Sequence, residues 1–447
     1  MTVGVGKGCW LAGFLGLVLM GSAWGGEPKN IVLIMSDDSA ADNYGCYGST
    51  YFSTPRLDAL AAEGARFTEC YSAPVCTSSR VKIMTGRDGI RNYAAFGCLD
   101  KGEETFGTML KNAGYATAVA GKWQLDGPPN GSMAEDCGFE NYCLWNYPGA
   151  KGSRFWNPTI VQDGESLVTT EDDYGPDIFT EYLIEFIREN KERPFFAYYP
   201  MVLVHSPFVR TPDSSPETAE LGRKERAIEY FRDMTAYADR CVGRIVDALE
   251  EMGLREDTVV IYTTDNGTGR GLVYPYGDEM REGEKAWATD GGTHAPLIVS
   301  CPGTVGPGIV CDDIVDFSDV LPSLAQISGA KLPEVTLDGR SFWPQCLGEE
   351  GDPRKWIFQY YYPKFTTAAE KHGQGVNGNE IVWAQTPRYK LYGDGSLYAV
   401  ADRYEEEVIP EGRGSEAAET ARRVLQAAIE SMPEKAAKLA AGMKEKK

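Results

Sequence analysis

Short apolar runs alternate with segments of helical periodicity along most of the chain. A continuous apolar run of about four to eight residues is typical of a strand that is buried on both faces. Such runs occupy residues 30–35, 116–120, 195–199, 258–263 and 297–301. Apolar positions recur at helical spacing in residues 55–64, 176–190 and 227–252. This alternation predicts an α/β fold in which a large, mostly parallel sheet is sandwiched by helices.

Local signals mark both ends of the helix predicted at residues 55–64. Thr54 is a typical N-cap residue, and Pro55 suits the first helical position. Gly64 is a typical residue at a helix C-terminus. We therefore expect the Thr54 side chain to accept a hydrogen bond from the first turn of this helix.

The pattern changes from about Trp356 onward. Short aromatic-rich runs separated by turns predict a small antiparallel sheet, with strands at residues 356–361, 381–384, 389–392 and 396–398. Residues 415–443 are rich in Ala, Glu, Lys and Arg, which predicts a solvated helix packed on the outside. We therefore divide the chain into a main α/β domain at residues 26–345 and a C-terminal α+β subdomain at residues 346–447.

The first 25 residues have the features of a signal peptide. Lys7 is followed by an apolar run at residues 10–20, which is too short to span a bilayer. Ala23 and Gly25 place small residues at the two positions that a signal peptidase reads. No later segment is long and apolar enough for a transmembrane helix. The sequence thus predicts an exported protein, periplasmic or extracellular, without a transmembrane segment.

Charge and histidine content narrow the function classes. The 44 Lys and Arg against 65 Asp and Glu give a net charge of −21, which excludes a nucleic-acid binder that works through a broad basic face. A two-zinc phosphatase site needs several histidines, and the chain has only three: His205, His294 and His372. We therefore expect neither nucleic acid as a partner nor a two-zinc centre.

Polar side chains follow four of the predicted strands. In sequence order they are Asp37 and Asp38, Lys122, His205 after an apolar run that continues to Val204, and Asp265 with Asn266. Because ligands of open α/β sheets bind beyond the carboxyl ends of the strands, these residues favour a single site. The carboxylates and the amide are oxygen ligands that suit Ca²⁺ or Mg²⁺ rather than zinc.

A further motif surrounds Cys76, in Cys76-Thr77-Ser78-Ser79-Arg80. Pro74 and the small polar residues indicate a turn that opens into a helix. Cys76 would then lie near the helix N-terminus, where the helix dipole favours negative charge. Arg80 would face the same way one turn later. Taken alone, the motif also fits a buried cysteine or half of a disulfide.

As a set, these motifs resemble those of the formylglycine-dependent (type I) sulfatases of the alkaline phosphatase superfamily. The resemblance runs from residue 30 to about residue 302 in matching order and spacing. Its motifs are at residues 34–38, 45–48, 54–58, 76–80, 85–87, 121–123, 205–207 and 264–267, with Lys285 five residues before Asp290-Gly291-Gly292. The resemblance implies an alkaline-phosphatase-like fold, with the catalytic domain at residues 26–345.

The resemblance also implies a nucleophile and a cofactor. A maturation enzyme would oxidise Cys76 to formylglycine, whose hydrate attacks sulfur, and Arg80 would steady this group. Calcium, with Mg²⁺ as the alternative ion, would bind a sulfate oxygen and the hydrate. Its implied ligands are Asp37, Asp38, Asp265 and Asn266. A metal together with cationic side chains stabilises the charge that develops on sulfate oxygens.

The remaining implied roles concern the substrate. Lys122 and Lys285 would hold sulfate oxygens. His205 would bind sulfate and help to protonate the leaving alcohol. Gln124 stands where the family usually has a histidine that takes a proton so that sulfate is expelled, and glutamine cannot act as a base near neutral pH. Our hypothesis is that Gln124 keeps the binding geometry while water or another group takes the proton.

The sequence therefore predicts an exported sulfatase that acts on a sulfated carbohydrate or another small sulfate ester. The net charge of −21 favours a short oligosaccharide or a high-salt setting, because it repels a long polyanion at low salt. A formylglycine-dependent phosphoester or phosphonoester hydrolase is one alternative. An inactive homologue that binds sulfated glycans is another; it is motivated by Gln124 and by Ser78, where the family usually has Pro or Ala.

Overall fold

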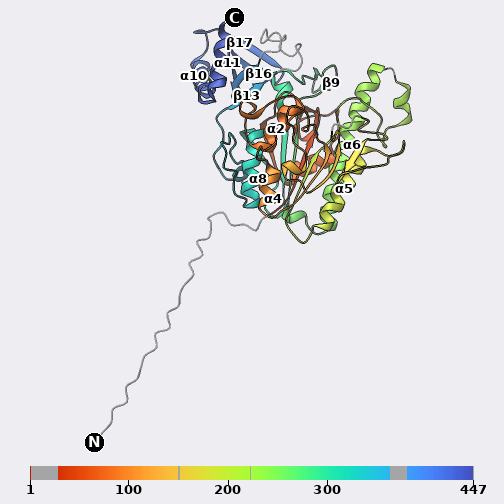
Figure 1. The fold of residues 1–447 in the computed structure, drawn as a ribbon. Coiled ribbons are helices and arrows are strands. Elements are labelled where there is room, and N and C mark those ends of the chain that lie inside the picture. The colour runs from red at the N-terminus through yellow and green to blue at the C-terminus, as the bar shows by residue number, and fades with distance from the viewer. Residues whose placement is uncertain (2–28, 149–151, 222, 363–379, 446–447) are drawn as a thin grey trace.

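The computed structural model describes residues 1, 29–148, 152–221, 223–362 and 380–445 (Figure 1). Apart from Met1, the predicted signal peptide lies outside the described residues, as does His372. None of the described helices is long and apolar enough to cross a membrane.

A ten-stranded sheet forms the centre of the molecule, in the order β12-β2-β11-β8-β1-β7-β3-β4-β5-β6. Its middle consists of the parallel neighbours β8 (Thr258–Thr264), β1 (Asn30–Ser36), β7 (Phe195–Pro200), β3 (Ala116–Lys122) and β4 (Asn141–Trp145). All of these except β4 were predicted from continuous apolar runs. The large, mostly parallel sheet is thereby confirmed.

The outer strands at both ends of this sheet include antiparallel pairs. On one side, β11 (His294–Ser300) runs antiparallel to both β8 and β2 (Ala65–Tyr71), and β12 (Ile309–Asp316) lies outside them. On the other side, β5 (Ile160–Gln162) and β6 (Glu165–Ser166) complete the sheet. A separate two-stranded ribbon consists of β9 (Val273–Tyr276) and β10 (Glu279–Glu282).

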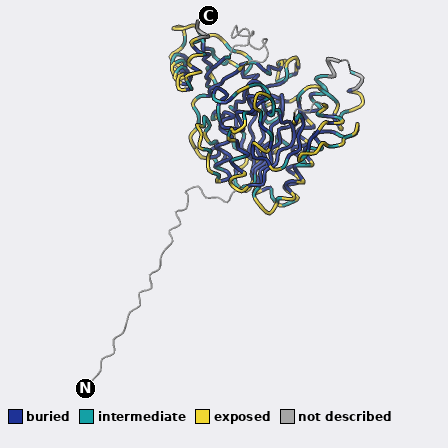
Figure 2. Tube along the Cα trace, in the orientation of Figure 1, coloured by how far each residue is buried: buried dark blue, intermediate teal, exposed yellow. Residues whose placement is uncertain are grey.

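Helices cover both faces of the sheet, and the core is buried between the layers (Figures 1 and 2). Strand β1 shows the reason, because Ile31 and Leu33 pack into one apolar cluster while Val32 and Ile34 pack into the other. The first cluster includes α2 (Cys76–Thr85), α4 (Phe106–Asn112) and α8 (Val320–Ser328). The second includes α1 (Pro55–Glu63), α5 (Gly175–Glu189) and α6 (Arg223–Glu251). Short helices are α3 (Gly89–Asn92), α7 (Asp290–Thr293) and α9 (Trp343–Cys346).

The predicted C-terminal antiparallel sheet is present and has five strands. They are β13 (Ile357–Tyr361), β14 (Ile381–Gln385), β15 (Tyr389–Tyr392), β16 (Leu397–Asp402) and β17 (Glu405–Ile409). The predicted single helix is two helices, α10 (Glu416–Ser431) and α11 (Glu434–Glu445), because Pro433 between them cannot continue a helix. Helix α10 also buries Leu425 and Ile429 in the cluster beneath this sheet. The domain division between residues 345 and 346 stays a prediction.

One local expectation was wrong. Thr54 does not cap α1; its hydroxyl accepts a hydrogen bond from the Gly45 amide instead (2.9 Å). The first amides of α1 donate to the carboxylate of Asp239 on α6, from Arg56 (3.0 Å) and Leu57 (2.8 Å). The apolar run that continues to Val204 forms a strand only as far as Pro200, although residues 201–204 stay buried.

Candidate active site

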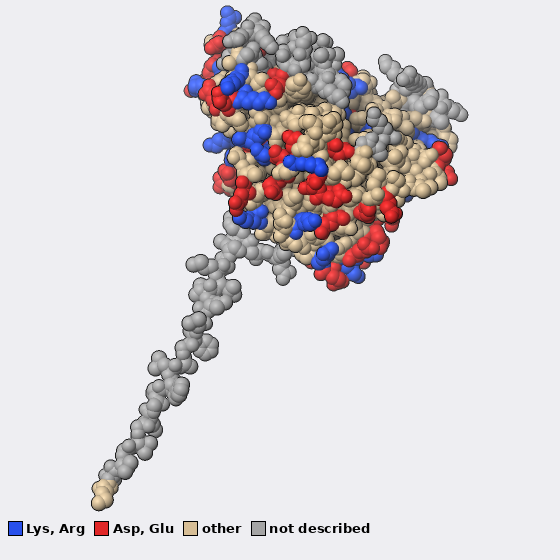
Figure 3. Space-filling view, viewed as in Figure 1, with Lys and Arg blue, Asp and Glu red and all other residues tan. Residues whose placement is uncertain are grey.

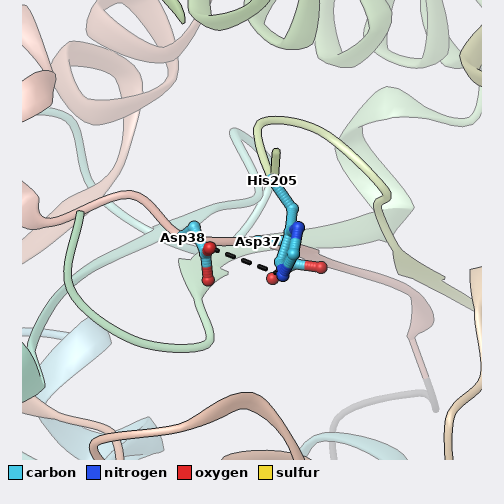
Figure 4. Close-up of side chains that lie close together, drawn as sticks. All are labelled: Asp37, Asp38 and His205. Carbon is cyan, nitrogen blue, oxygen red and sulfur yellow. Dashed lines mark ion pairs between the residues drawn. The ribbon is translucent and has the colours of Figure 1, made fainter. Parts of the chain in front are cut away.

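The order of the strands brings the predicted polar residues together. Because β8, β1, β7 and β3 are parallel neighbours, their carboxyl ends lie at one edge of the sheet. The ammonium group of Lys122 lies 2.6 Å from Asp37 Oδ2. Nε2 of His205 lies 3.6 Å from Asp38 Oδ2 (Figure 4), and the Asp38 amide donates to Asp265 Oδ1 at 3.1 Å. Residues from four strand ends thus share one site.

Backbone hydrogen bonds hold the His205 loop against the end of β1. The Met201 amide donates to Met35 O (2.9 Å), and Asp37 exchanges 2.7 Å hydrogen bonds with Leu203 O and the Val204 amide. Nδ1 of His205 lies 2.6 Å from Ser206 O. Because a carbonyl oxygen can only accept, this contact requires a proton on Nδ1 and leaves Nε2 facing Asp38.

Cys76 is the first residue of α2, as predicted, and its side chain is buried. The preceding turn is held by Ser79, whose hydroxyl accepts from the Ala73 amide (2.9 Å) and donates to Ala73 O (3.0 Å). Ser78 donates to Val75 O at 2.8 Å, inside the same turn. Cys76 is free, as is every other cysteine in the described ranges, so the half-disulfide interpretation receives no support there.

Arg80 connects this helix to the acidic residues. Its Nη2 lies 3.1 Å from Asp265 Oδ2 and 3.7 Å from Asp37 Oδ2, and its Nη1 donates to Lys122 O at 3.0 Å. Arg80 is only 1% exposed, so its charge is balanced by these carboxylates rather than by water. The contact predicted between Arg80 and the Cys76 position stays a prediction.

Lys285 and Asn266 complete the surroundings of Asp38. The Lys285 ammonium group contacts Asp38 Oδ1, which also accepts from Asn266 Nδ2 at 2.9 Å. Asn266 Nδ2 donates to Gly267 O as well (2.9 Å), which turns the Asn266 carbonyl oxygen away from these partners. Gln124 lies two residues after Lys122 in a left-handed conformation with φ of 59°.

Burial and neighbouring charges shift the pKa values of the site in opposite directions. Burial alone would raise the pKa of Asp37, but the surrounding cationic side chains hold it well below its ordinary value. These are Lys122, His205, Arg80 and Lys285. Burial and the charge of Asp37 raise the pKa of Asp265 to about 7. Burial also lowers the pKa of His205, against the opposing effect of Asp38.

The donor set fits a hard cation. Oδ1 of Asp37 and Oδ1 of Asn266 are buried and have no hydrogen-bond partner among the described residues. Buried oxygens without a donor are costly unless a ligand satisfies them. One ligand atom from each of Asp37, Asp38 and His205 can be chosen so that all lie within 4.8 Å of one another. An oxygen-rich set with paired carboxylates favours Ca²⁺ or Mg²⁺.

Two residues near the site were given no role from the sequence. His294, which the sequence left without a role, lies against Thr68, with Nε2 2.8 Å from its carbonyl oxygen, and it packs on Tyr71. It is therefore a structural residue of the sheet. Arg154 was missed, although its guanidinium lies 3.9 Å above the ring centre of Trp145, the last residue of β4. Its position in an irregular loop gave no sequence signal.

Comparison with known proteins decides the family. The Sulfatase family model matches residues 29–330. The chain belongs to the sulfatase family. Human arylsulfatase A is 32% identical to it over 373 residues, which cover 76% of this chain and 71% of that protein. The predicted family of sulfuric ester hydrolases is thus confirmed.

Solved structures confirm the fold of this sulfatase. Ps i-CgsB in complex with k-i-k-neocarrahexaose has a TM-score of 0.71 at 20% identity, covering 92% of this chain and 93% of that chain. BT4656 in complex with its substrate D-glucosamine-2-N,6-O-disulfate has a TM-score of 0.69 at 19% identity, covering 94% and 100%. At these identities the likeness concerns the fold.

Proposed function

We propose that this sulfatase hydrolyses sulfate monoesters of a carbohydrate, or of another small molecule, with formylglycine made from Cys76 and a bound Ca²⁺. The observation that carries the proposal is the meeting of oxygen ligands and cationic side chains beside the buried N-terminus of α2. A sulfate group presents three peripheral oxygens, which such a set of charges complements. Carbohydrate is favoured because two proteins of the same fold were solved with carbohydrate ligands.

The proposed nucleophile and cation would be held by residues of this site. Formylglycine supplies an oxygen nucleophile for sulfur as its hydrate, and Ca²⁺, when bound, supplies positive charge next to a sulfate oxygen. The proposed ligands are Asp37, Asp38, Asp265 and Asn266, with Mg²⁺ as the alternative ion. The unsatisfied buried oxygens of Asp37 and Asn266 support this set.

Side chains of the site would bind the sulfate group and transfer the proton. Lys122 and Lys285, which contact the acidic residues from two sides, would hold sulfate oxygens. Arg80 would neutralise Asp265 and steady the group at position 76. His205 would donate a proton to the leaving alcohol, and the carboxylate of Asp38 partly offsets the lowering of its pKa by burial. Gln124 would orient the substrate by hydrogen bonding.

The proposal includes maturation and export. A maturation enzyme would oxidise Cys76, which requires that it accepts Ser78 in the motif. The apolar segment near the N-terminus would direct the protein to the periplasm or the extracellular space. A sulfated carbohydrate outside the cytoplasm would then be the substrate.

The decisive test combines a mass measurement with turnover. The protein is produced with a maturation enzyme that is active on a control, and the tryptic peptide of residues 67–80 is weighed. Its second cysteine, Cys70, serves as an internal control that should keep its thiol. We expect formylglycine at position 76 and release of sulfate from 4-nitrophenyl sulfate or from sulfated sugars.

Other outcomes separate the alternatives. An intact thiol at Cys76 would remove the nucleophile and overturn the hydrolase proposal. Release of phosphate in preference to sulfate from matched esters would favour the phosphoester or phosphonoester hydrolase. Binding of sulfated sugars without release of sulfate would favour a glycan-binding homologue.

A further inference from the structure

Arg154 is a cationic residue near the site. None of the roles proposed above involves it. Its Nη1 is buried and has no hydrogen-bond partner within the described part of the chain. No carboxylate among the described residues lies within ion-pair distance of it, whereas Asp37, Asp38 and Asp265 are all contacted by other cationic groups. The guanidinium stays charged, and a buried nitrogen without an acceptor is costly, so an anionic ligand at Nη1 would stabilise it.

The neighbouring strand places Arg154 beside the sulfate-binding residues. Its guanidinium stacks on Trp145 at 3.9 Å, and Trp145 is the register partner of Lys122 in the parallel pair of β3 and β4. Paired residues of neighbouring strands point to the same face of a sheet. Burial lowers the pKa of Arg154, and the charges of Asp37 and Asp38 oppose this shift, which agrees with a place near these carboxylates.

Hydrogen bonds hold the backbone on both sides of Arg154. The Trp145 indole donates to Gly152 O (3.2 Å), and the Thr159 amide donates to Ser153 O (2.9 Å). On the other side, the Gly175 amide donates to Phe155 O at 2.8 Å. A Cβ on Gly175 would lie 2.2 Å from the backbone oxygen of Arg154, so glycine is needed for this close approach. The stacked guanidinium is thus preorganised for a ligand.

We propose that Arg154 is a specificity-determining residue that binds a second anionic group of the substrate, a carboxylate or a second sulfate, next to the sulfate ester that is cleaved. This inference rests on the proposed function. The cleaved sulfate already has Lys122, Lys285 and the proposed cation as partners, so a further fixed positive charge matches a further negative charge. A guanidinium fork is suited to carboxylate and sulfate oxygens.

Binding to a Cys76→Ala protein tests this without turnover. Two ligand pairs are measured by calorimetry, and the members of each pair differ mainly in the second anionic group. One pair is D-glucosamine-2-N,6-O-disulfate and N-acetylglucosamine 6-sulfate; the other is glucuronic acid 2-sulfate and glucose 2-sulfate. The pair with the larger preference for its dianionic member distinguishes a second sulfate from a carboxylate.

We expect Arg154→Gln to weaken the preferred dianionic ligand by about tenfold or more, and the matching monoanionic ligand by less than about twofold. Arg154→Lys should retain part of the preference, because it keeps the charge and loses the fork. Arg210→Gln is the matched control, since the exposed Arg210 also stacks on a tryptophan, Trp156. It should change neither affinity.

Each contrary outcome overturns the inference. Equal losses for both members of a pair would show that Arg154 supports the common sulfate or the fold. The second anionic subsite would be excluded by unchanged affinities in Arg154→Gln or by the absence of a preference for the dianionic ligands when Arg154 is present. It would also be excluded if none of the four ligands binds. Release of sulfate by the matured protein from 4-nitrophenyl sulfate or from sulfated sugars, measured separately, decides the proposed function itself.

Discussion

Gln124 stands where the resemblance implies a histidine, which makes it an informative residue to change. Its left-handed φ of 59° is a conformation that histidine adopts more readily than most residues. Its Oε1 is buried and has no partner among the described residues, so the side chain faces a confined space. Histidine should therefore fit at this position and add a base that glutamine lacks.

A base at position 124 should speed the expulsion of sulfate. Gln124→His should raise kcat by about a hundredfold, the usual contribution of a general base, with little change in KM. Steady-state hydrolysis of 4-nitrophenyl sulfate by matured protein measures this. Gln124→Asn, which adds no base, should not raise kcat. An unchanged or lower kcat in Gln124→His would mean that another group already takes the proton.

His294 gives a pH prediction that is independent of the active site. Burial, helped by the charge of Arg403, lowers its pKa to about 3. Below about pH 6.5 the unfolded chain binds a proton at this residue, whereas the folded chain does not. The contribution of His294 to the free energy of unfolding is therefore fully present above that pH and is lost as the pH falls toward 3.

His294→Gln should flatten this dependence. Glutamine can still donate to Thr68 O and does not titrate. Between pH 6 and 4 the free energy of unfolding of the variant should fall less steeply than that of the parent, by up to about 1.4 kcal/mol per pH unit. Urea unfolding at several pH values measures both slopes. Parallel curves would show that His294 is protonated in the folded protein.

At the scale of elements, the start of α1 depends on a carboxylate from a distant helix. Asp239 of α6 is 2% exposed and accepts from the amides of Arg56 and Leu57. Asp239→Ala leaves both amides without this acceptor and should lower the free energy of unfolding by about 2 kcal/mol. Asp239→Asn should cost less, because its amide oxygen can still accept.

Asp247→Ala is the control for this prediction. Asp247 lies two turns further along α6 and contacts the Arg56 side chain, but the pair is exposed to solvent. Exposed pairs contribute little, so thermal unfolding of this variant should match that of the parent. Equal losses for Asp239→Ala and Asp247→Ala would mean that capping of α1 by Asp239 is not important.

The strands of the central sheet were largely predictable from the sequence, whereas contacts between elements were not. Strands β1, β3, β7 and β8 are continuous apolar runs, so their existence and the polar residues at their ends were predictable. Strand β2 was missed because ARFTECY interleaves charged residues with apolar ones. Asp239 contacts α1, and Arg154 contacts Trp145, only because of the way the elements pack. Local sequence patterns do not determine this packing, so these contacts could not be predicted.

At the scale of the whole molecule, a buried ion-pair group joins the C-terminal sheet to α7, the short helix that leads into β11 of the central sheet. Lys390 of β15 is fully buried and lies 3.0 Å from Asp290 of α7 and 2.7 Å from Glu406 of β17. Lys390→Met would leave two buried carboxylates without their cation and should lower the free energy of unfolding by about 3–5 kcal/mol. Chemical denaturation measures this loss.

Two further variants check the origin of that loss. Lys390→Met combined with Glu406→Gln should recover part of the stability, because one uncompensated charge is removed. Lys331→Met removes an exposed lysine that pairs with Glu334, and it should leave unfolding unchanged. If Lys390→Met is as stable as the parent, this ion-pair group does not contribute to holding the C-terminal sheet, and other contacts such as Arg403 with Glu69 of β2 hold it instead.

The charge of the whole molecule opposes the charge of its site. The net charge is −21, and Figure 3 shows acidic side chains mainly on the lower part of the face that it presents, with some basic side chains among them. The site itself gathers Lys122, Lys285, Arg80 and Arg154. A long sulfated polymer must approach the acidic surface, whereas a short fragment meets mainly the site.

Salt should therefore affect the two kinds of substrate differently. Between 0.01 and 0.1 M salt the screening length falls from about 30 Å to about 10 Å, which weakens repulsion by the surface more than contacts inside the site. For a sulfated polysaccharide, kcat/KM should rise at least about twofold over this range. For its disaccharide unit, kcat/KM should stay level or fall slightly. A decrease for both would mean that the local positive charge governs encounter at every length of substrate.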